Sequence, residues 1–191
     1  MKHPFDPLLN SKTKNILVGT LPPESAPYYF SNSSNTRLWD ILKSITEGKN
    51  EIVKGSNKLS DIEKEKLLST LEVGIYDIIL EYNRDIMDST QDKHIIPEKY
   101  SDLMSLAKQY RIDKLLFVYK NAAKWFLHSL ESEQPKRIQR LKYDIDYGVF
   151  KTIKAEHGDI KCILLPSPLN RGKKGETLEF KLNAYQKEIK E

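Results

Sequence analysis

The residues best suited to chemistry lie in one long connection between two apolar segments. Residues 19–35 read GTLPPESAPYYFSNSSN, with three aromatic side chains, two asparagines and one carboxylate, Glu24. A connection usually needs only about 4–6 residues, so this one is longer than a fold requires. Aromatic rings stack on planar ligands, and an amide offers a donor beside an acceptor, which suits a nucleobase edge or a water molecule. The connection therefore predicts a binding site for a planar, polar ligand.

Each of these side chains also has a structural interpretation. Asn35 can cap the helix that is predicted to follow it. Tyr28 and Phe30 can pack into the core, and Tyr29, which they flank, is the better candidate for stacking on a ligand. Glu24 can polarise a water molecule or lie on the solvated surface. The residue types alone leave both interpretations open.

The elements that must position these residues alternate between two types. Four short apolar runs are predicted as strands: residues 15–20, 75–80, 115–120 and 160–166. Their continuous apolarity is typical of strands buried on both faces of a parallel sheet. Helical patterns cover residues 37–45, 60–71, 98–110, 121–130 and 178–189. The predicted fold class is α/β, a three-layer α/β/α sandwich with a central, mostly parallel four-stranded sheet.

Chain length and composition favour one domain covering residues 1–191. We find no internal repeat and no linker, and the segment 131–148 is either an extra helix or a surface insertion. The sequence has no long apolar run, and its first ten residues do not resemble a secretory signal. We therefore expect a soluble, cytoplasmic monomer that does not bind a membrane.

In α/β sheets, ligands bind beyond the carboxyl ends of the strands. The loops expected there are residues 19–35, 81–94 and 166–177. Gly19 ends the first strand, where the absence of a Cβ lets the backbone approach a ligand. Pro22 and Pro23 stiffen the turn that follows. These loops are the predicted walls of the site.

The distribution of charged residues along the chain says more about possible partners than the net charge does. Lysine and arginine number 31 against 27 aspartates and glutamates, a net charge of +4. Basic residues cluster in 136–142 and 171–174, and acidic residues in 61–65 and 72–77. This asymmetry favours a positive face toward a phosphate backbone, and ordinary solvated surface charge is the alternative.

No cofactor or metal is expected. Cys162 is the single cysteine, so an internal disulfide and a four-cysteine iron–sulfur cluster are both impossible. The four histidines do not pair with Cys162 at the spacing of zinc ligands. The sequence contains neither a Gly-x-Gly-x-x-Gly motif nor a P-loop, which argues against dinucleotide and nucleoside triphosphate cofactors.

The stretch 19-GTLPPESAPYYFSNSSNTRLWDIL-42 resembles the first motif of the uracil-DNA glycosylase superfamily. The similarity is closest to the mismatch-specific and hypoxanthine-DNA glycosylase branch. Three further stretches resemble this group in the same order along the chain: 3–19, 74–89 and 166-PSPLNRG-172. Leu165, which precedes the last of these, replaces a histidine of the group. The resemblance implies a monofunctional base-excision repair enzyme that flips a deaminated base, uracil or hypoxanthine, out of DNA and hydrolyses its N-glycosidic bond.

The resemblance also implies roles for individual residues. Asn35 would orient the attacking water. The base would be bound by Gly19, Thr20, Leu21, Pro22 and Tyr29, with Tyr29 as the stacking face. DNA would be contacted by Arg84 and by Ser167, Pro168, Leu169, Asn170, Arg171, Lys173 and Lys174. Leu169 or Asn170 would fill the gap that the flipped base leaves, and the basic residues would contact phosphates; an exposed turn is the alternative.

Leu21 departs from the superfamily pattern. In several branches its position holds an Asp or Asn that positions the attacking water. The apolar side chain of leucine cannot hydrogen-bond a water molecule. Glu24 is the second candidate for polarising the water. This departure keeps two alternatives open: a member of weak or lost activity that binds nucleic acid or a free base, and a hydrolase of free nucleosides or nucleotides.

Overall fold

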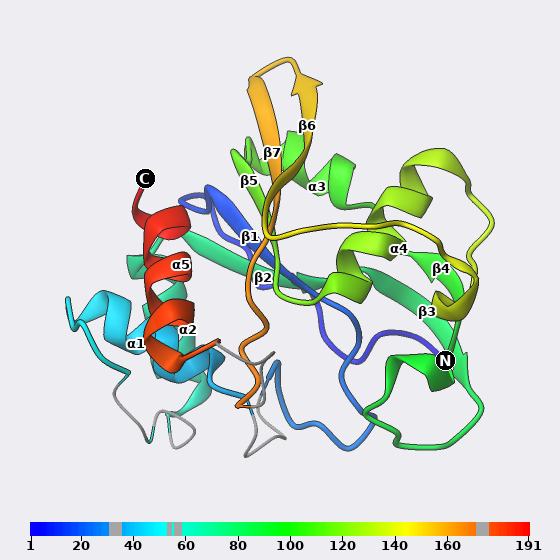
Figure 1. Cartoon of the computed structure of the whole chain (residues 1–191), viewed down its shortest axis with the longest axis horizontal. Coiled ribbons are helices and arrows are strands. Elements are labelled where there is room, and N and C mark those ends of the chain that lie inside the picture. Colours follow the sequence, from blue (N-terminus) through cyan, green and yellow to red (C-terminus); the bar gives the residue numbers. More distant parts are fainter. Residues whose placement is uncertain (31–35, 53–54, 56–58, 171–175) are drawn as a thin grey trace.

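The computed structural model describes residues 1–30, 36–52, 55, 59–170 and 176–191 (Figure 1). Its main sheet has five strands in the order β2-β1-β5-β7-β6. Their bounds are β1 Asn15–Gly19, β2 Val73–Asp77, β5 Lys114–Phe117, β6 Gly148–Ala155 and β7 Gly158–Leu164. The strands β1, β2, β5 and β7 run parallel, and β6 pairs antiparallel with β7. The carboxyl ends of the parallel strands therefore meet at one edge of the sheet.

Five α-helices flank this sheet, α1 Leu38–Thr46, α2 Asp61–Thr70, α3 Leu103–Tyr110, α4 Lys120–Glu131 and α5 Leu178–Lys190. In Figure 1, α1, α2 and α5 group on one side of the sheet, and α3 and α4 lie on the other. A small antiparallel sheet joins β3 Ile79–Arg84 to β4 Ile95–Tyr100 beside α4. Among the described residues, the short 3₁₀ helices η2 Asp92–His94 and η3 Ile138–Arg140 lie in the connections. The predicted α/β class with helices flanking a mostly parallel sheet is confirmed.

The main sheet was predicted to have four strands and has five. The additional strand is β6. This strand reads GVFKTIKA, and none of its residues is fully buried. An edge strand that faces solvent carries a polar pattern rather than the continuous apolarity used to predict the other four. The segment 131–148 forms the end of α4, the short helix η3 and an extended connection into β6.

Two predicted element boundaries were also wrong. The run 75–80 was predicted as one strand, but β2 ends at Asp77 and β3 begins at Ile79. Ile78 lies between the two sheets, because its N–H bonds to the carbonyl of Gly19 while its carbonyl accepts from Ser101. The helix predicted from residue 98 starts at Leu103 instead, where the Asp102 side chain caps it by accepting from the Ser105 N–H at 2.9 Å.

The core is continuous and apolar, with β1 and β2 buried along their whole lengths. Trp39 of α1 and Trp125 of α4 are among the largest fully buried side chains. The predicted capping box is present, since Ser60 and Glu63 exchange side-chain and backbone hydrogen bonds at the start of α2. Cys162 is buried, and burial raises the pKa of its thiol to about 12. None of the described helices is both long and apolar enough to cross a membrane.

Candidate functional site

A cavity of about 960 Å³ opens at the carboxyl ends of the parallel strands. Its lining comes from the connection after β1, from η2, from the start of α4, from η3 and from Leu169. The residues that line it include Thr20, Leu21, Phe30, Asp77, Asp92, Tyr119, Asn121 and Leu169. A second cavity of about 380 Å³ lies at the opposite strand ends, among charged residues such as Lys14, Glu72 and Asp113. The larger cavity occupies the position where α/β proteins bind ligands.

Gly19 makes the floor of this site possible. A Cβ built at Gly19 would lie 2.2 Å from Oδ1 of Asp77 and 3.1 Å from Cζ of Phe30. The first distance is too short for a carbon atom and the second is unusually tight, so the absence of a side chain lets Asp77 and Phe30 lie against the backbone. Asp77 is 4% exposed, and its Oδ2 lies 3.0 Å from Nε2 of His3. The chain thereby brings together a residue from its start, the end of β1 and the end of β2.

Tyr29 is built into the core more deeply than predicted. It is 1% exposed, its ring stacks on His3 with centroids 5.6 Å apart, and its hydroxyl donates to the Asp6 carbonyl at 3.2 Å. Its carbonyl accepts a hydrogen bond from the indole of Trp39. Burial raises the pKa of the Tyr29 hydroxyl well above its usual range. Tyr29 still contributes to the cavity wall, but one of its faces is occupied by His3.

Phe30 is the aromatic side chain that the sequence interpretation undervalued. It is only half-buried, has a left-handed backbone with φ of 53°, and lies 6.2 Å from the ring of Tyr119. Tyr28 is also half-buried, and its ring lies under the Lys64 ammonium group at 4.7 Å. The expectation that Tyr28 and Phe30 fill the core while Tyr29 stays available is therefore reversed. The sequence prediction placed Tyr28 and Phe30 on one side and Tyr29 on the other. The left-handed backbone at Phe30 is not visible in the sequence.

Arg84 was predicted to contact DNA, and the structure places it in the interior instead. Its side chain is 1% exposed, and its guanidinium donates to the carbonyl of Pro22 at 2.8 Å and to the carbonyl of Ser89. Its Nε also lies 2.8 Å from Oε1 of Glu24, with which it forms an ion pair. Arg84 therefore fastens the connection after β1 to the loop after β3. Glu24, the second candidate for activating water, is part of this fastening and does not line the cavity.

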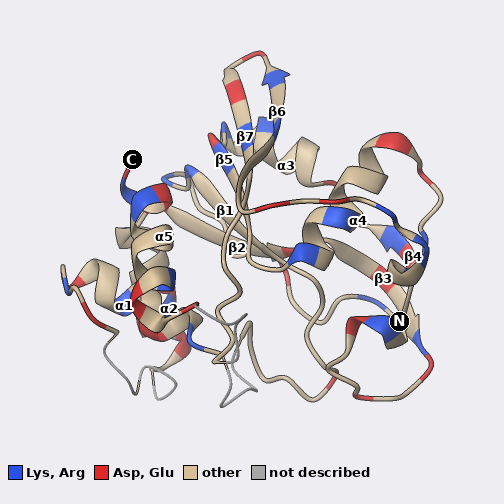
Figure 2. Cartoon of the chain, viewed as in Figure 1, with Lys and Arg blue, Asp and Glu red and all other residues tan. Residues whose placement is uncertain are grey.

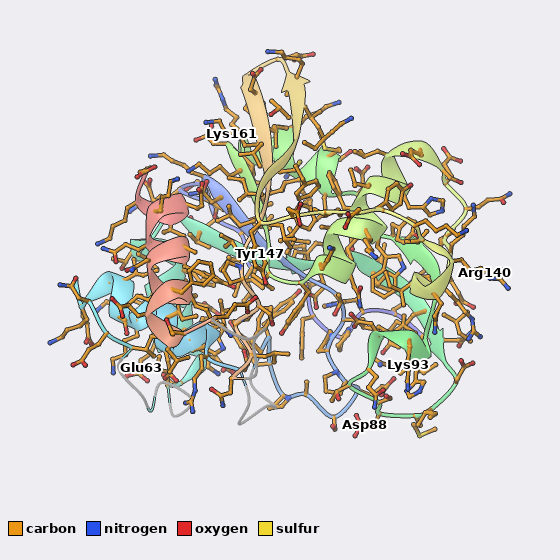
Figure 3. All side chains as sticks on the ribbon, viewed as in Figure 1. Glu63, Asp88, Lys93, Arg140, Tyr147 and Lys161 are labelled. Atoms are coloured by element: carbon orange, nitrogen blue, oxygen red, sulfur yellow. The ribbon has the colours of Figure 1, made fainter. Side chains whose placement is uncertain are left out.

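A second set of hydrogen bonds joins the connection after β1 to the loop after β3. The N–H and the hydroxyl of Ser25 both donate to Oδ1 of Asp88, at 3.1 and 2.9 Å. These hydrogen bonds hold the pKa of the Asp88 carboxyl below its usual value. Figure 3 shows Asp88 at the edge of the molecule, on the side where the loops gather. The predicted base-binding residues Thr20, Leu21 and Pro22 all line the cavity that this framework supports.

The loop after β7 is anchored from behind by α5. Lys181, fully buried, donates from Nζ to the Leu169 carbonyl at 2.5 Å, and Tyr185 donates to the Pro166 carbonyl at 3.1 Å. The Arg37 N–H donates to the Pro168 carbonyl at 2.7 Å. Burial lowers the pKa of the Lys181 ammonium group. The loop is thus held rigidly enough to present Leu169 at the cavity.

The remaining predicted DNA contacts divide into two groups. Ser167 is half-buried, Pro168 is buried and Asn170 is exposed, where its Oδ1 accepts from Nε of Arg37 at 2.6 Å. Four predicted site residues lie outside the described residues: Asn35, Arg171, Lys173 and Lys174. Among the residues that the structure describes, no group of three or more His, Cys, Asp and Glu side chains could hold a metal ion.

Sequence reasoning missed Asp92 and Asn121, which meet at the cavity wall. Asn121 donates from Nδ2 to Oδ2 of Asp92 at 2.8 Å, and the Thr20 hydroxyl also hydrogen-bonds this carboxyl. Burial among protein atoms raises the pKa of Asp92, and the hydrogen bonds from Asn121 and Thr20 only partly oppose this shift. The signal was weak, because Asp92 lies in a polar loop and Asn121 at a helix start, where either residue type is ordinary.

Basic side chains surround the cavity entrance. Lys93 and Lys124 line it, and the segment 136–142 adds Lys136, Arg137, Arg140 and Lys142 beside η3. Figure 2 shows basic residues gathered around α4 and β4, and Figure 3 places Lys93 and Arg140 on this same side. Arg137 forms a bidentate ion pair with Asp85, and the Gln139 amide donates to the Lys93 carbonyl. The predicted basic cluster thus lies next to the predicted ligand site.

No family model and no curated protein sequence matches this chain significantly. Solved structures do match, among them the solution NMR structure of a "putative Uracil DNA glycosylase" from Methanosarcina acetivorans. The superposition covers 98% of this chain and 97% of that chain, with a TM-score of 0.60 and 17% sequence identity. The chain has a uracil-DNA glycosylase-like fold. At this identity the likeness establishes the architecture, and the activity has to be argued from the site.

Proposed function

We propose that the protein is a monofunctional DNA glycosylase that hydrolyses the N-glycosidic bond of a deaminated base in DNA. The observation that carries this proposal is the cavity of about 960 Å³ at the strand ends, which combines aromatic faces with the buried carboxyl of Asp77 and the half-buried side chains of Asp92 and Asn121. A flipped base needs both, because it is held by stacking and by hydrogen bonds to its edge. The shared architecture with a solved glycosylase-like protein supports the same function.

Within this proposal, Phe30 and Tyr119 supply the stacking faces. Both line the cavity, and their rings are 6.2 Å apart at an interplanar angle of 33°. Asp77 at the floor and Asn121 on the wall are placed to hydrogen-bond the edge of the base. Gly19 does not itself line the cavity, but it leaves room for Asp77 at the floor. Tyr29 contributes mainly by holding the wall in place.

The DNA side of the proposal rests on the cavity entrance. Leu169 lines the cavity from a loop whose carbonyls are anchored to α5, so it is positioned to enter the space that a flipped base vacates. The basic residues around the entrance, Lys93, Lys124 and those of 136–142, would contact phosphates on either side. Asn35, Arg171, Lys173 and Lys174 keep the roles that the sequence resemblance gives them as part of this proposal.

The decisive experiment is a panel of oligonucleotides that carry uracil, hypoxanthine or xanthine, each single-stranded and double-stranded. Incubation with the purified protein followed by alkali cleavage at abasic sites is expected to yield a strand break with at least one of them. Untreated samples should remain uncut, because a monofunctional enzyme leaves the sugar–phosphate backbone intact. No abasic product from any substrate would contradict the enzymatic proposal.

A binding module without chemistry is the second candidate, and Leu21 favours it. This apolar side chain lines the cavity at the position where related enzymes carry a water-positioning residue. Salt-dependent binding of damaged DNA without turnover in the same panel would support the module. Turnover of any damaged base would reject it.

A pair of leucine substitutions tests which aromatic stacks on the base. Phe30→Leu is expected to raise KM about tenfold at nearly unchanged Tm, because base stacking on an aromatic contributes about 1–3 kcal/mol. Tyr29→Leu is expected to lower the free energy of unfolding by about 2 kcal/mol with a smaller change in KM, because that ring is packed in the core. Kinetics and thermal unfolding of both variants provide the comparison. The opposite pattern would restore Tyr29 as the stacking residue.

A further inference from the structure

Asp92 has surroundings that a structural role does not explain. It begins the three-residue helix η2, whose N-cap is Gln91, and the Asp92 side chain makes no cap of its own. The partners of its carboxyl come from distant elements, Asn121 at the start of α4 and Thr20 after β1. In the described part of the chain, no lysine or arginine forms an ion pair with it. A half-buried carboxyl whose hydrogen-bond partners are neutral costs stability unless its charge serves a purpose.

The location of Asp92 in the lining of the proposed ligand site suggests what this purpose is. Asp92 lines the same cavity as Phe30, Tyr119 and Asp77, the space where we propose that the base and its sugar lie. The Asn121 amide fixes the orientation of this carboxyl through the 2.8 Å bond to Oδ2. A carboxylate held at the wall of a partly dry cavity can hydrogen-bond a water molecule and accept its proton.

We propose that Asp92 is the proton acceptor for the attacking water, an inference that rests on the proposed glycosylase function. The water oxygen bonds to C1′ of the deoxyribose as the C1′–N bond breaks, and the electron pair of that bond leaves with the base. The water proton passes to the Asp92 carboxylate. The products are the free base, as its anion until it is protonated, and an abasic sugar that carries the new hydroxyl. Asp92 then returns its proton to the base or to solvent.

The other carboxylates of the site are less suited to this step. Glu24 is held in the ion pair with Arg84 and does not line the cavity. Asp77 is held by His3 and packed against the backbone of Gly19, which suits a residue that binds the base at the floor. Asp92 therefore supplies from η2 the carboxylate that is missing at Leu21.

The electrostatic environment agrees with this role. Burial and the charge of Asp77 raise the pKa of Asp92, whereas hydrogen bonds from Asn121 and Thr20 and the charge of Arg84 lower it. Besides Asp77, the other titratable groups that line this cavity are Tyr28, Tyr29, Lys93, Tyr119 and Lys124. The net shift is upward, toward the working pH, which makes the carboxylate a stronger proton acceptor.

Single-turnover kinetics of Asp92→Asn test the inference on whichever base the panel identifies. The amide keeps the shape and the acceptor for Asn121 but cannot take a proton. The rate is expected to fall by about 100-fold or more, with affinity for the damaged oligonucleotide within about twofold of wild type. Wild-type rate should rise with pH through the pKa of Asp92, and the variant should lose this rise. Asp159→Asn is the matched control, because Asp159 of β7 carries an exposed carboxylate that pairs with Lys154 of β6. Its kinetics should be unchanged.

Two further readouts separate proton transfer from a structural role. Asn121→Ala removes a donor that lowers the pKa of Asp92, so the rising limb of the pH–rate profile should move to higher pH. Because the folded-state pKa of Asp92 is raised, its ionisation costs stability as pH rises above the unfolded value. Asp92→Asn should therefore have a higher Tm than wild type at neutral pH, a difference that shrinks as the pH falls toward 4.

The outcomes that overturn the inference are distinct from failure of the proposed function. An active wild type whose Asp92→Asn variant turns over at the same rate would overturn the inference alone. Equal losses of affinity and rate would make Asp92 a base-binding residue, and a lowered Tm would make it a structural one. A wild type that is inactive on every substrate would overturn the proposed function and the inference together.

Discussion

Replacement of Arg84 by methionine is expected to lower the free energy of unfolding by about 3 kcal/mol, because it strands the partners of a buried charge. The Arg84 side chain is 1% exposed and bonds the carbonyls of Pro22 and Ser89 as well as Glu24, which is 25% exposed. Loss of this guanidinium releases the connection after β1 from the loop after β3. Activity should fall with stability, as measured by chemical unfolding and by the glycosylase assay.

Arg137→Met is the matched control for this substitution. Arg137 also forms an ion pair with an aspartate, Asp85, but both side chains are substantially exposed. Stability should change little there, since exposed pairs are screened by solvent. The double variant Arg84→Met with Glu24→Gln should recover part of the loss, because it removes the unpaired carboxylate. If Arg84→Met instead keeps wild-type stability and loses only DNA affinity, the original prediction of a DNA contact is correct.

Replacement of Gly19 by alanine is expected to abolish measurable turnover and to destabilise the protein by about 1–3 kcal/mol, the usual cost of overpacking. The added methyl group would lie 2.2 Å from Oδ1 of Asp77 and 3.1 Å from Cζ of Phe30. Asp77 can move away only by giving up its 3.0 Å hydrogen bond to His3, and Phe30 can move only by shifting its ring relative to that of Tyr119. The floor of the cavity and one stacking face should both be displaced. Thermal unfolding and single-turnover kinetics measure the two effects.

A second substitution separates the steric effect from the chemical one. In Gly19→Ala with Asp77→Ala, the closest contact is gone, so stability should recover relative to Gly19→Ala alone. Activity should stay low, because the carboxyl that we assign to the base edge is absent. Wild-type stability in Gly19→Ala by itself would contradict the tight approach between Gly19 and Asp77.

The fold class followed from the sequence because continuous apolar runs can be buried only between two layers of helices. The runs around β1, β5 and β7 predicted the parallel strands, and Ser60 with Glu63 marked the start of α2. The polar edge strand β6 escaped this reasoning, since an exposed strand has no need of apolar residues. The resemblance of residues 19–42 to a glycosylase motif indicated the right architecture.

The cavity side chains were only partly predictable, because contacts between distant segments decide their roles. Nothing in the order of Tyr29 and Phe30 reveals that His3 covers the first, or that a left-handed backbone turns the second toward Tyr119. Arg84 was predicted to contact DNA, but its guanidinium donates to the carbonyls of Pro22 and Ser89, which are distant or non-adjacent in the sequence.

The sequence by itself determined the layers of this protein and which loops follow the parallel strands, because these depend on local patterns of apolarity. Gly19 was expected to let the backbone approach a ligand, and the structure places the side chains of Asp77 and Phe30 there. Only the tertiary structure decided which polar groups share the cavity. Asp92 and Asn121 are 29 residues apart and meet at 2.8 Å. Burial there, rather than residue type, raises the pKa of Asp92 and makes an ordinary loop aspartate a candidate for chemistry.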